Sequence, residues 1–278
     1  MHDAIIPKDI LTASQTAIEM IAGSYIKITP IVLKKFLSQT LQLNRQEIKM
    51  VVKNLVASQE VTYTYEYGTT FLEISFNKPV RISDRITLSP PECAFMPQPD
   101  EVVVKIRSGP SFGTGQHPTT RLALRGLDFA LQNQRRLLPK SGACQLDIGA
   151  GSGVLAIAGV KLGIKKALGI DIDPCARFEA RANISLNMLA GAVEIGGMAL
   201  ESITKRYDVI TANLRFPTLI RLCVKLSEIT SDNGFIVLSG VKTDELGTLL
   251  ETYHAQSFVC IWKGNSKEWI GAVFKKIC

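Results

Sequence analysis

Residues 145–158 read Gln145-Leu-Asp-Ile-Gly-Ala-Gly-Ser-Gly-Val-Leu-Ala-Ile-Ala158, the pattern of a buried strand that ends in a glycine turn and runs into a helix. The turn contains Gly149, Gly151 and Gly153, which allow backbone conformations and close approaches that a Cβ atom would block. A ligand can therefore lie against it. A dinucleotide-binding turn requires Gly-x-Gly-x-x-Gly, and Val154 stands where its last glycine would be. The spacing does not favour a dinucleotide pyrophosphate.

An acidic residue, Asp147, lies two positions before the glycine turn. A carboxylate there is unfavourable for an anion at the helix N-terminus and suits an ammonium group. S-adenosylmethionine carries an ammonium group and no phosphate. We therefore expect S-adenosylmethionine as the cofactor, with Asp147 and the three glycines among its contacts.

A second acidic residue follows the next predicted strand. Asp171 lies 22 residues after Gly149, where a doubly wound fold places the carboxylate that holds two ribose hydroxyls. We expect Asp171 and the adjacent Ile172 to contact the cofactor; a cap or turn role is the alternative for Asp171. Asp173 precedes a proline and is predicted to be the N-cap of the next helix.

The chain from Ser141 onward alternates apolar strands with helices, the pattern of a mostly parallel sheet covered on both faces. It predicts a seven-stranded, doubly wound, Rossmann-like α/β domain. A short turn at Lys263-Gly264-Asn265 should make the last two strands antiparallel. The expected strands are residues 143–148, 167–172, 193–195, 207–212, 234–239, 257–262 and 270–275.

The N-terminal part, residues 1–84, has helical apolar spacing to about Ala57, then two alternating β-rich runs around Gly68. Three helices and a hairpin predict a small winged-helix-like recognition domain. Its third helix carries a basic stripe of Arg45, Lys49 and Lys53, which could contact nucleic acid or be a solvated face. Residues 85–107 are rich in proline and are expected to be a connecting β-hairpin, followed by the catalytic domain at 108–278.

A more specific pattern lies upstream, at Ser108-Gly-Pro-Ser-Phe-Gly-Thr-Gly-Gln-His-Pro-Thr-Thr120. Together with the glycine turn, it resembles class I S-adenosylmethionine-dependent methyltransferases. More narrowly, it is similar to the enzymes that modify ribosomal large-subunit protein L-eleven and to the related lysine methyltransferases of mitochondrial flavoprotein β-subunits. The resemblance implies that Phe112, Thr114, Gly115 and His117 fold over the cofactor, with a purely loop-fixing role as the alternative for His117. From the residues alone, Thr119 or Thr120 could cap the following helix.

The segment Tyr207-Asp-Val-Ile-Thr-Ala-Asn-Leu-Arg-Phe-Pro217 ends the fourth strand, at the sheet edge where ligands bind in this fold class. Asn213 is expected to face the sulfonium methyl and to position the acceptor through its amide oxygen; a turn-forming asparagine is the alternative. The family reads Asn-Ile-Leu-Ala there, whereas this chain has Arg215 and Phe216 beside the expected acceptor channel. No strong general base is evident.

The amino-acid composition argues against a membrane-spanning, disulfide-stabilised or metal-binding protein. The 278 residues are 46% hydrophobic and 21% charged, as in ordinary globular proteins, and no apolar run approaches the roughly 18 residues of a membrane span. The six cysteines form no Cys-x-x-Cys pair, so we expect reduced thiols, a cytoplasmic location, no signal peptide and no metal site. The net charge is +7, of which residues 1–84 carry +1. Any polyanion-binding surface is therefore expected on the C-terminal part.

The leading interpretation is a protein methyltransferase that acts on a lysine or amino group, with ribosomal and other translation proteins as the expected class of substrate. An RNA or small-molecule methyltransferase is one alternative, with the basic stripe as the RNA contact. A winged-helix regulator that only senses the cofactor is another, although Asn213 on the acceptor side argues against it. Residues 1–84 do not have the ferredoxin-like pattern of the family's substrate-capturing domain, so the resemblance does not transfer the substrate.

Overall fold

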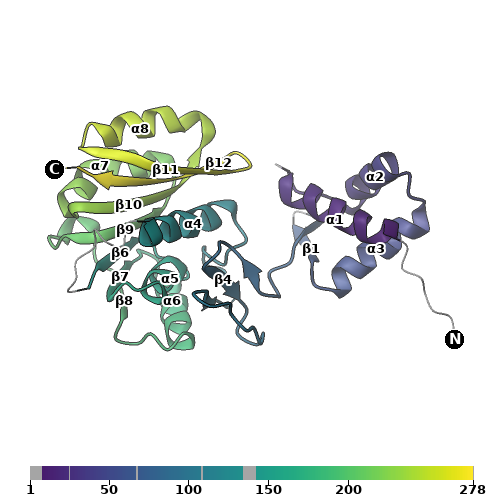
Figure 1. Cartoon of the computed structure of the whole chain (residues 1–278), viewed down its shortest axis with the longest axis horizontal. Helices are drawn as coiled ribbons and strands as arrows, with labels where there is room; N and C mark the ends of the chain where they lie inside the picture. The colour runs from purple at the N-terminus through teal and green to yellow at the C-terminus, as the bar shows by residue number, and fades with distance from the viewer. Residues whose placement is uncertain (1–7, 25, 67, 108, 134–141, 278) are drawn as a thin grey trace. The chain divides into compact units, whose positions relative to one another are not determined.

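The computed structural model describes residues 8–24, 26–66, 68–107, 109–133 and 142–277. The chain divides into two compact units, Met1–Lys78 and Pro79–Cys278 (Figure 1). The division falls six residues before the boundary that the sequence predicted after Asp84. The difference arises because Ile82 and Ile86 are buried in the core of the second unit. Within the described ranges, no helix is long and apolar enough to cross a membrane.

The N-terminal unit has the predicted order of three helices and a hairpin. Asn44 caps the third helix, in a capping box with Glu47, and Ile48, Val51 and Leu55 of that helix are buried. An isolated antiparallel bridge joins Ile28 to the hairpin. The winged-helix assignment and the role of the exposed basic stripe stay predictions. The elements are α1 (Lys8–Gly23), α2 (Pro30–Leu41), α3 (Arg45–Ala57), β1 (Val61–Glu66) and β2 (Thr69–Ile74).

The second unit contains the predicted seven-stranded sheet. Its strand order is β11-β12-β10-β9-β6-β7-β8, and only β12 is antiparallel to its neighbours, β10 and β11. The turn between β11 and β12 lies at residues 267–268 instead of 263–265, because β11 continues beyond its apolar segment to Ser266. The strands are β6 (Cys144–Ile148), β7 (Lys166–Ile170), β8 (Val193–Gly196), β9 (Tyr207–Asn213), β10 (Thr230–Lys242), β11 (Phe258–Ser266) and β12 (Trp269–Lys276).

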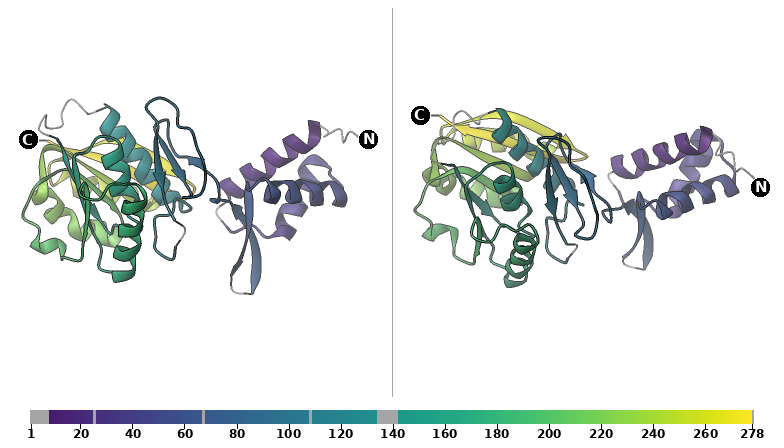
Figure 2. Two further views of the ribbon diagram at one scale, coloured as in Figure 1. Left: turned by 90° about the horizontal axis from the view of Figure 1, so that it is seen from below. Right: turned by 60° about the horizontal axis from the view of Figure 1, so that its bottom comes forward.

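Helices cover both faces of this sheet, so each face has its own apolar core. Residues of α4 (Pro118–Asn133), α5 (Val154–Lys161) and α6 (Pro174–Leu186) belong to one core, and residues of α7 (Phe216–Ile229) and α8 (Leu246–His254) to the other. Both views in Figure 2 show α4 lying across the sheet. Ligands in such open sheets bind beyond the C-terminal ends of the parallel strands. That edge is formed by the ends of β6, β7, β9 and β10.

The prediction of a connecting β-hairpin at residues 85–107 is wrong. The strands β4 (Ile86–Ser89) and β5 (Val102–Lys105) pair in parallel, and β3 (Val80–Arg81) pairs antiparallel to β4. Parallel pairing needs a long crossover, and residues 90–101 supply it. Arg85 also pairs with Asp128 of α4 at 2.6 Å. This small sheet is therefore part of the second unit's core and not a linker.

Candidate functional site

The glycine turn between β6 and α5 has the left-handed backbone that its glycines were predicted to allow. Gly149, Gly151 and Gly153 all have positive φ angles, of 69°, 53° and 80°. A Cβ atom on Gly151 would lie 2.4 Å from the backbone oxygen of Phe112. This position therefore needs glycine both for its left-handed backbone and for the close approach of the loop that contains Phe112.

Asp147 lies beneath this turn and is completely buried. Its carboxylate accepts hydrogen bonds from the Thr211 hydroxyl at 2.7 Å and from the Ala156 backbone N–H at 3.3 Å. Ala156 is in the first turn of α5, whose N-cap, Gly153, has no side chain to accept such a bond. Asp147 therefore supplies the missing cap. Because its side chain exposes no surface, it stabilises the turn from within the core and offers no contact to a bound ligand.

Burial also changes the acidity of this carboxyl group. Desolvation raises the pKa of Asp147 to about 7, although the hydrogen bonds from Thr211 and Ala156 oppose the shift. Gln145, also fully buried, donates from Nε2 to Thr211 Oγ1 at 3.0 Å. The three polar side chains form one connected network under the strand ends of β6 and β9.

Asp171 follows β7 and is only half-buried. One carboxylate oxygen accepts from the Gly151 N–H at 2.8 Å, and the other accepts from the Asp173 N–H at 2.9 Å. A carboxylate has about four acceptor positions, so each oxygen retains one for a further donor. Asp173 is the N-cap of α6, as predicted. The neighbouring Ile172 side chain is 92% exposed beside this carboxylate.

The loop that contains Phe112 is fastened to the glycine turn. Ser152 donates its backbone N–H to the Phe112 oxygen at 2.8 Å and its hydroxyl to the Gly113 oxygen at 2.9 Å. The Phe112 side chain remains 51% exposed. Thr114 is half-buried and Gly115 buried in the same loop. The upstream motif and the glycine turn, about 30 residues apart in sequence, thus form one surface.

His117 ends this loop and caps α4. Its Nδ1 accepts from the Thr119 backbone N–H at 3.3 Å and lies 2.8 Å from the Thr119 hydroxyl. The expected threonine cap is therefore wrong, because the histidine ring occupies the capping position. Its ring lies 5.2 Å from that of Phe112 and 5.3 Å from that of Trp269. Burial, with the positive charges of Arg121 and Lys267, lowers the pKa of His117, so the imidazole is neutral at pH 7.

Asn213 lies at the end of β9, next to the loop and the turn. Its side-chain Nδ2 donates to the Thr120 hydroxyl at 3.4 Å. The amide oxygen takes no part in this bond and can accept from another donor. The next residue, Leu214, lies against Gly149, because a Cβ there would be 2.6 Å from Leu214 Cδ2. Arg215 is exposed, whereas Phe216 packs on the apolar core under α7.

The candidate site is therefore formed by the ends of β6, β7 and β9 and by the loop before α4. A sequence model of the ribosomal protein L11 methyltransferase (PrmA) family matches residues 33–277. The chain belongs to this family. All the candidate residues fall within the matched region. The match also includes α3 and the hairpin of the N-terminal unit.

Individual members of the ribosomal protein L11 methyltransferase family agree with this match. One from Pelobacter propionicus is 35% identical over 199 residues, which are 72% of this chain and 63% of that relative. One from Oceanobacillus iheyensis is 29% identical over 253 residues, 88% of this chain and 77% of that relative. The chain thus covers less than two thirds of the length of the first of these. The structure of a ribosomal protein L11 methylase from Lactobacillus delbrueckii subsp. bulgaricus superposes on this chain with a TM-score of 0.63 at 26% identity. The match covers 72% of this chain and the whole of the Lactobacillus chain.

Several residues of the site could not be identified from their neighbours in sequence. Ser152 lies between the glycines of the turn, and its two hydrogen bonds to the loop before α4 are long-range. Asn183 of α6 also bridges distant segments, because it accepts from the Arg107 N–H and donates to the Ser152 oxygen. Trp269 reaches His117 from the first position of β12. Its aromatic character was visible in the sequence, but its place at this edge depends on the sheet order.

Proposed function

We propose that this protein is an S-adenosylmethionine-dependent methyltransferase whose acceptor is an amino group of a protein, with ribosomal protein L11 as the first candidate substrate. The observation that carries the proposal is the pair of hydrogen bonds by which Ser152 holds the loop of Phe112 against the glycine turn. The family match supports the reaction class, and the relatives that are ribosomal protein L11 methyltransferases support the candidate substrate. Such a substrate would place the chain in the cytoplasm.

The residues present fit this cofactor. Asp171 retains an acceptor position on each oxygen, which suits the two ribose hydroxyls. Gly151 has no side chain, so the backbone of Phe112 can approach the turn and Asp171 can be held by the Gly151 N–H beside it. Phe112 offers a half-exposed ring at the same surface, and Ile172 an exposed aliphatic side chain. When bound, the cofactor supplies an electrophilic methyl group on a positively charged sulfur.

The protein's own contribution is alignment and exclusion of water. Methyl transfer needs the acceptor lone pair in line with the bond that breaks, so positioning accounts for much of the rate. Asn213 has its Nδ2 committed to Thr120, which fixes the direction of the amide oxygen. That oxygen can accept an N–H from the incoming amine and orient its lone pair. Phe112 and His117 close the site with apolar or neutral surface.

Asp147 contributes indirectly in this scheme. The sequence suggested that it contacts the ammonium group of the cofactor, but its carboxylate is fully enclosed. We infer that it fixes the first turn of α5, and through it the shape of the glycine turn, by its bond from Ala156. In this role, its loss would weaken cofactor binding without removing a cofactor contact.

The test combines labelled S-adenosylmethionine with purified ribosomal protein L11 and, separately, with a fractionated cell extract. We expect label in the protein fraction, and mass spectrometry should place it on an amino group. An Asn213→Ala variant should bind the cofactor with near wild-type affinity and transfer methyl groups at least about tenfold more slowly. Label confined to RNA or to small molecules would refute a protein acceptor and favour the alternative acceptors.

A further inference from the structure

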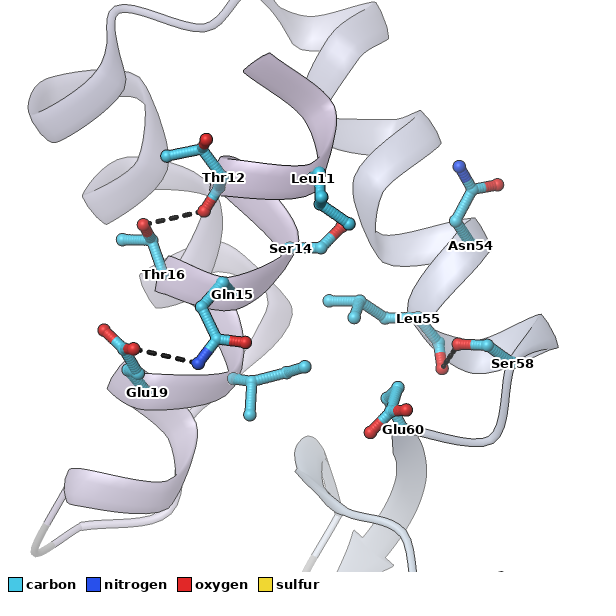
Figure 3. Close-up of a pocket in the computed structure, with 11 residues that line it drawn as sticks. Leu11, Thr12, Ser14, Gln15, Thr16, Glu19, Asn54, Leu55, Ser58 and Glu60 are labelled. Atoms are coloured by element: carbon cyan, nitrogen blue, oxygen red, sulfur yellow. Dashed lines mark hydrogen bonds between the residues drawn. The ribbon is translucent and has the colours of Figure 1, made fainter. Parts of the chain in front are cut away.

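The N-terminal unit has a groove of about 820 Å³ between α1 and α3 (Figure 3). Its lining includes the exposed apolar side chain of Leu11 and the carboxylates of Glu19 and Glu60. These features do not identify a ligand. The second unit has a more specific arrangement, in which one helix holds the backbone that leads into the candidate site.

This helix, α6, presents three polar side chains at intervals of four residues: Glu179, Asn183 and its C-cap residue Asn187. Residues with this spacing lie on one face of a helix. Asn183 and Asn187 are only 2% and 5% exposed, so both amides are buried. Because a buried amide needs partners for its donor and its acceptor, the partners of this face show what the helix holds.

The partners are backbone N–H groups of the chain that continues from β5 towards the loop of Phe112. The hydrogen bonds, with their donor–acceptor distances, are Lys105 to Asn187 at 3.0 Å, Arg107 to Asn183 at 3.1 Å and Ser111 to Glu179 at 3.2 Å. Residue numbers rise along this segment as they fall along α6, so the two run antiparallel. A Cβ atom on Gly109 would lie 2.5 Å from Glu179 Oε2, which shows how closely the segment follows the helix.

Asn183 differs from the other two side chains because it also bonds to the glycine turn. Its Nδ2 donates to the Ser152 backbone oxygen at 3.0 Å, while its Oδ1 accepts from Arg107. Ser152 in turn holds Phe112 and Gly113 through its N–H and its hydroxyl. One buried amide therefore fixes the spacing between the chain that enters the loop and the turn on which the loop lies.

We propose that Asn183 is a positioning residue for the cofactor, which holds the loop of Phe112 and the glycine turn in their binding arrangement before the cofactor arrives. Preorganisation of this kind raises affinity, because the loop does not have to be ordered at the moment of binding. Asn183 acts through Ser152 and is not itself an expected cofactor contact. The inference rests on the proposed S-adenosylmethionine-dependent activity and deepens it by assigning a residue that sets cofactor affinity.

The experiment uses matched variants of the full-length chain. Asn183→Asp keeps an acceptor for the Arg107 N–H but places a carboxylate oxygen against the Ser152 oxygen. Asn187→Asp is the control, because Asn187 is similarly buried and donates to the backbone oxygens of Lys105 and Asn183, so its hydrogen bonds fasten β5 and do not involve the glycine turn. Asn183→Ala and Asn187→Ala form a second pair without a buried charge, for use if an aspartate variant melts below the assay temperature.

Calorimetry measures the Kd of S-adenosylmethionine, and steady-state rates with ribosomal protein L11 give the cofactor KM and the kcat. Asn183→Asp should raise the cofactor Kd and KM about tenfold, the factor that corresponds to the loss of about one buried hydrogen bond. The kcat at saturating cofactor should stay within about twofold of the wild type, because the bound cofactor restores the loop. Asn187→Asp should lower the melting temperature by a similar amount and leave the cofactor Kd unchanged.

A second measurement tests whether Asn183 acts through Ser152. In a Ser152→Ala background, the hydroxyl bond to Gly113 is absent, so Ser152 holds the loop less firmly. The effect of Asn183→Asp on the cofactor Kd should therefore be smaller in this background than in the wild type, as expected for coupled residues. Equal effects in the two backgrounds would refute the route through Ser152.

The remaining outcomes separate this inference from the proposed function. If the wild type binds the cofactor and the Asn183 and Asn187 variants change its Kd equally, the positioning role is refuted and the methyltransferase function stands. If Asn183→Asp lowers kcat and leaves the cofactor Kd unchanged, the residue serves the transfer step and the role in cofactor binding is refuted. If the wild type binds no S-adenosylmethionine, the proposed function and the positioning role are both refuted.

Discussion

Replacement of Gly151 by alanine should separate the loop that contains Phe112 from the glycine turn. The residue has φ of 53°, and alanine in this left-handed conformation costs about 1–2 kcal/mol. The new Cβ would also lie 2.4 Å from the Phe112 oxygen, which must then move away from the Ser152 N–H. Loss of that hydrogen bond adds about 1 kcal/mol. The free energy of unfolding of Gly151→Ala should therefore fall by about 2–3 kcal/mol.

A matched control separates backbone strain from the steric clash. Gly191 has φ of 86°, and a Cβ there would meet nothing within 4 Å. Gly191→Ala should therefore cost only the conformational term, about 1–2 kcal/mol, and leave cofactor binding unchanged. Gly151→Ala should weaken S-adenosylmethionine binding at least about tenfold, because its N–H also holds Asp171. The assays are denaturant unfolding and calorimetric titration; wild-type affinity in Gly151→Ala would refute the proposed coupling of loop and turn.

Three further predictions concern the acidic and basic groups of the site. Asp171→Ala should weaken S-adenosylmethionine binding severely, and an unchanged calorimetric Kd would remove this residue from the ribose contact. Asp147 has its pKa raised to about 7 in the folded chain, above its unfolded value of about 4, so the native state binds more protons and stability falls as pH rises between these values. Asp147→Asn should flatten that slope in urea unfolding, and an identical slope would show that another group causes it. His117 has a lowered pKa, so the native state binds fewer protons and its contribution to stability is lost as pH falls below about 6.5. Emission of Trp269, in a Trp262→Phe background, should report protonation of this histidine at a pH below its ordinary value of about 6.5, and a pH-independent signal would contradict the contact between the two rings.

The sheet was predictable because its signals are local. Each strand from β6 to β12 contains a short apolar run, so the seven strands appear at or near their expected positions. The final turn was misplaced because β11 continues through polar residues to Ser266, where pairing with β12 replaces apolar burial. Lys267 takes a left-handed conformation in the observed turn, which no local signal indicated.

The first part of the second unit was harder to predict for a related reason. Two short apolar runs separated by prolines suggest a hairpin, but β4 and β5 pair in parallel and pack on α4 and α5. Strand direction depends on contacts with distant segments, such as the ion pair of Arg85 with Asp128. Sequence spacing carries no information about such contacts.

At the site, the motifs identified residues that the fold brings together, but not the contacts that these residues make. Asp147 was expected at a ligand, yet it is enclosed because Thr211, 64 residues later, supplies a hydrogen bond from the adjacent strand. His117 was expected in the loop, but its role as helix cap was not, because histidine is not among the usual capping residues. These roles depend on the geometry of neighbouring strands and helix ends, which one sequence does not specify.

Methyl transfer from labelled S-adenosylmethionine to purified ribosomal protein L11, followed by identification of the modified atom, tests the central claim most directly. The account predicts label on an amino nitrogen of the protein and a strong loss of rate in Asn213→Ala with the cofactor affinity preserved. Tight cofactor binding by the wild type without transfer to L11 or to any protein of a cell extract would contradict it.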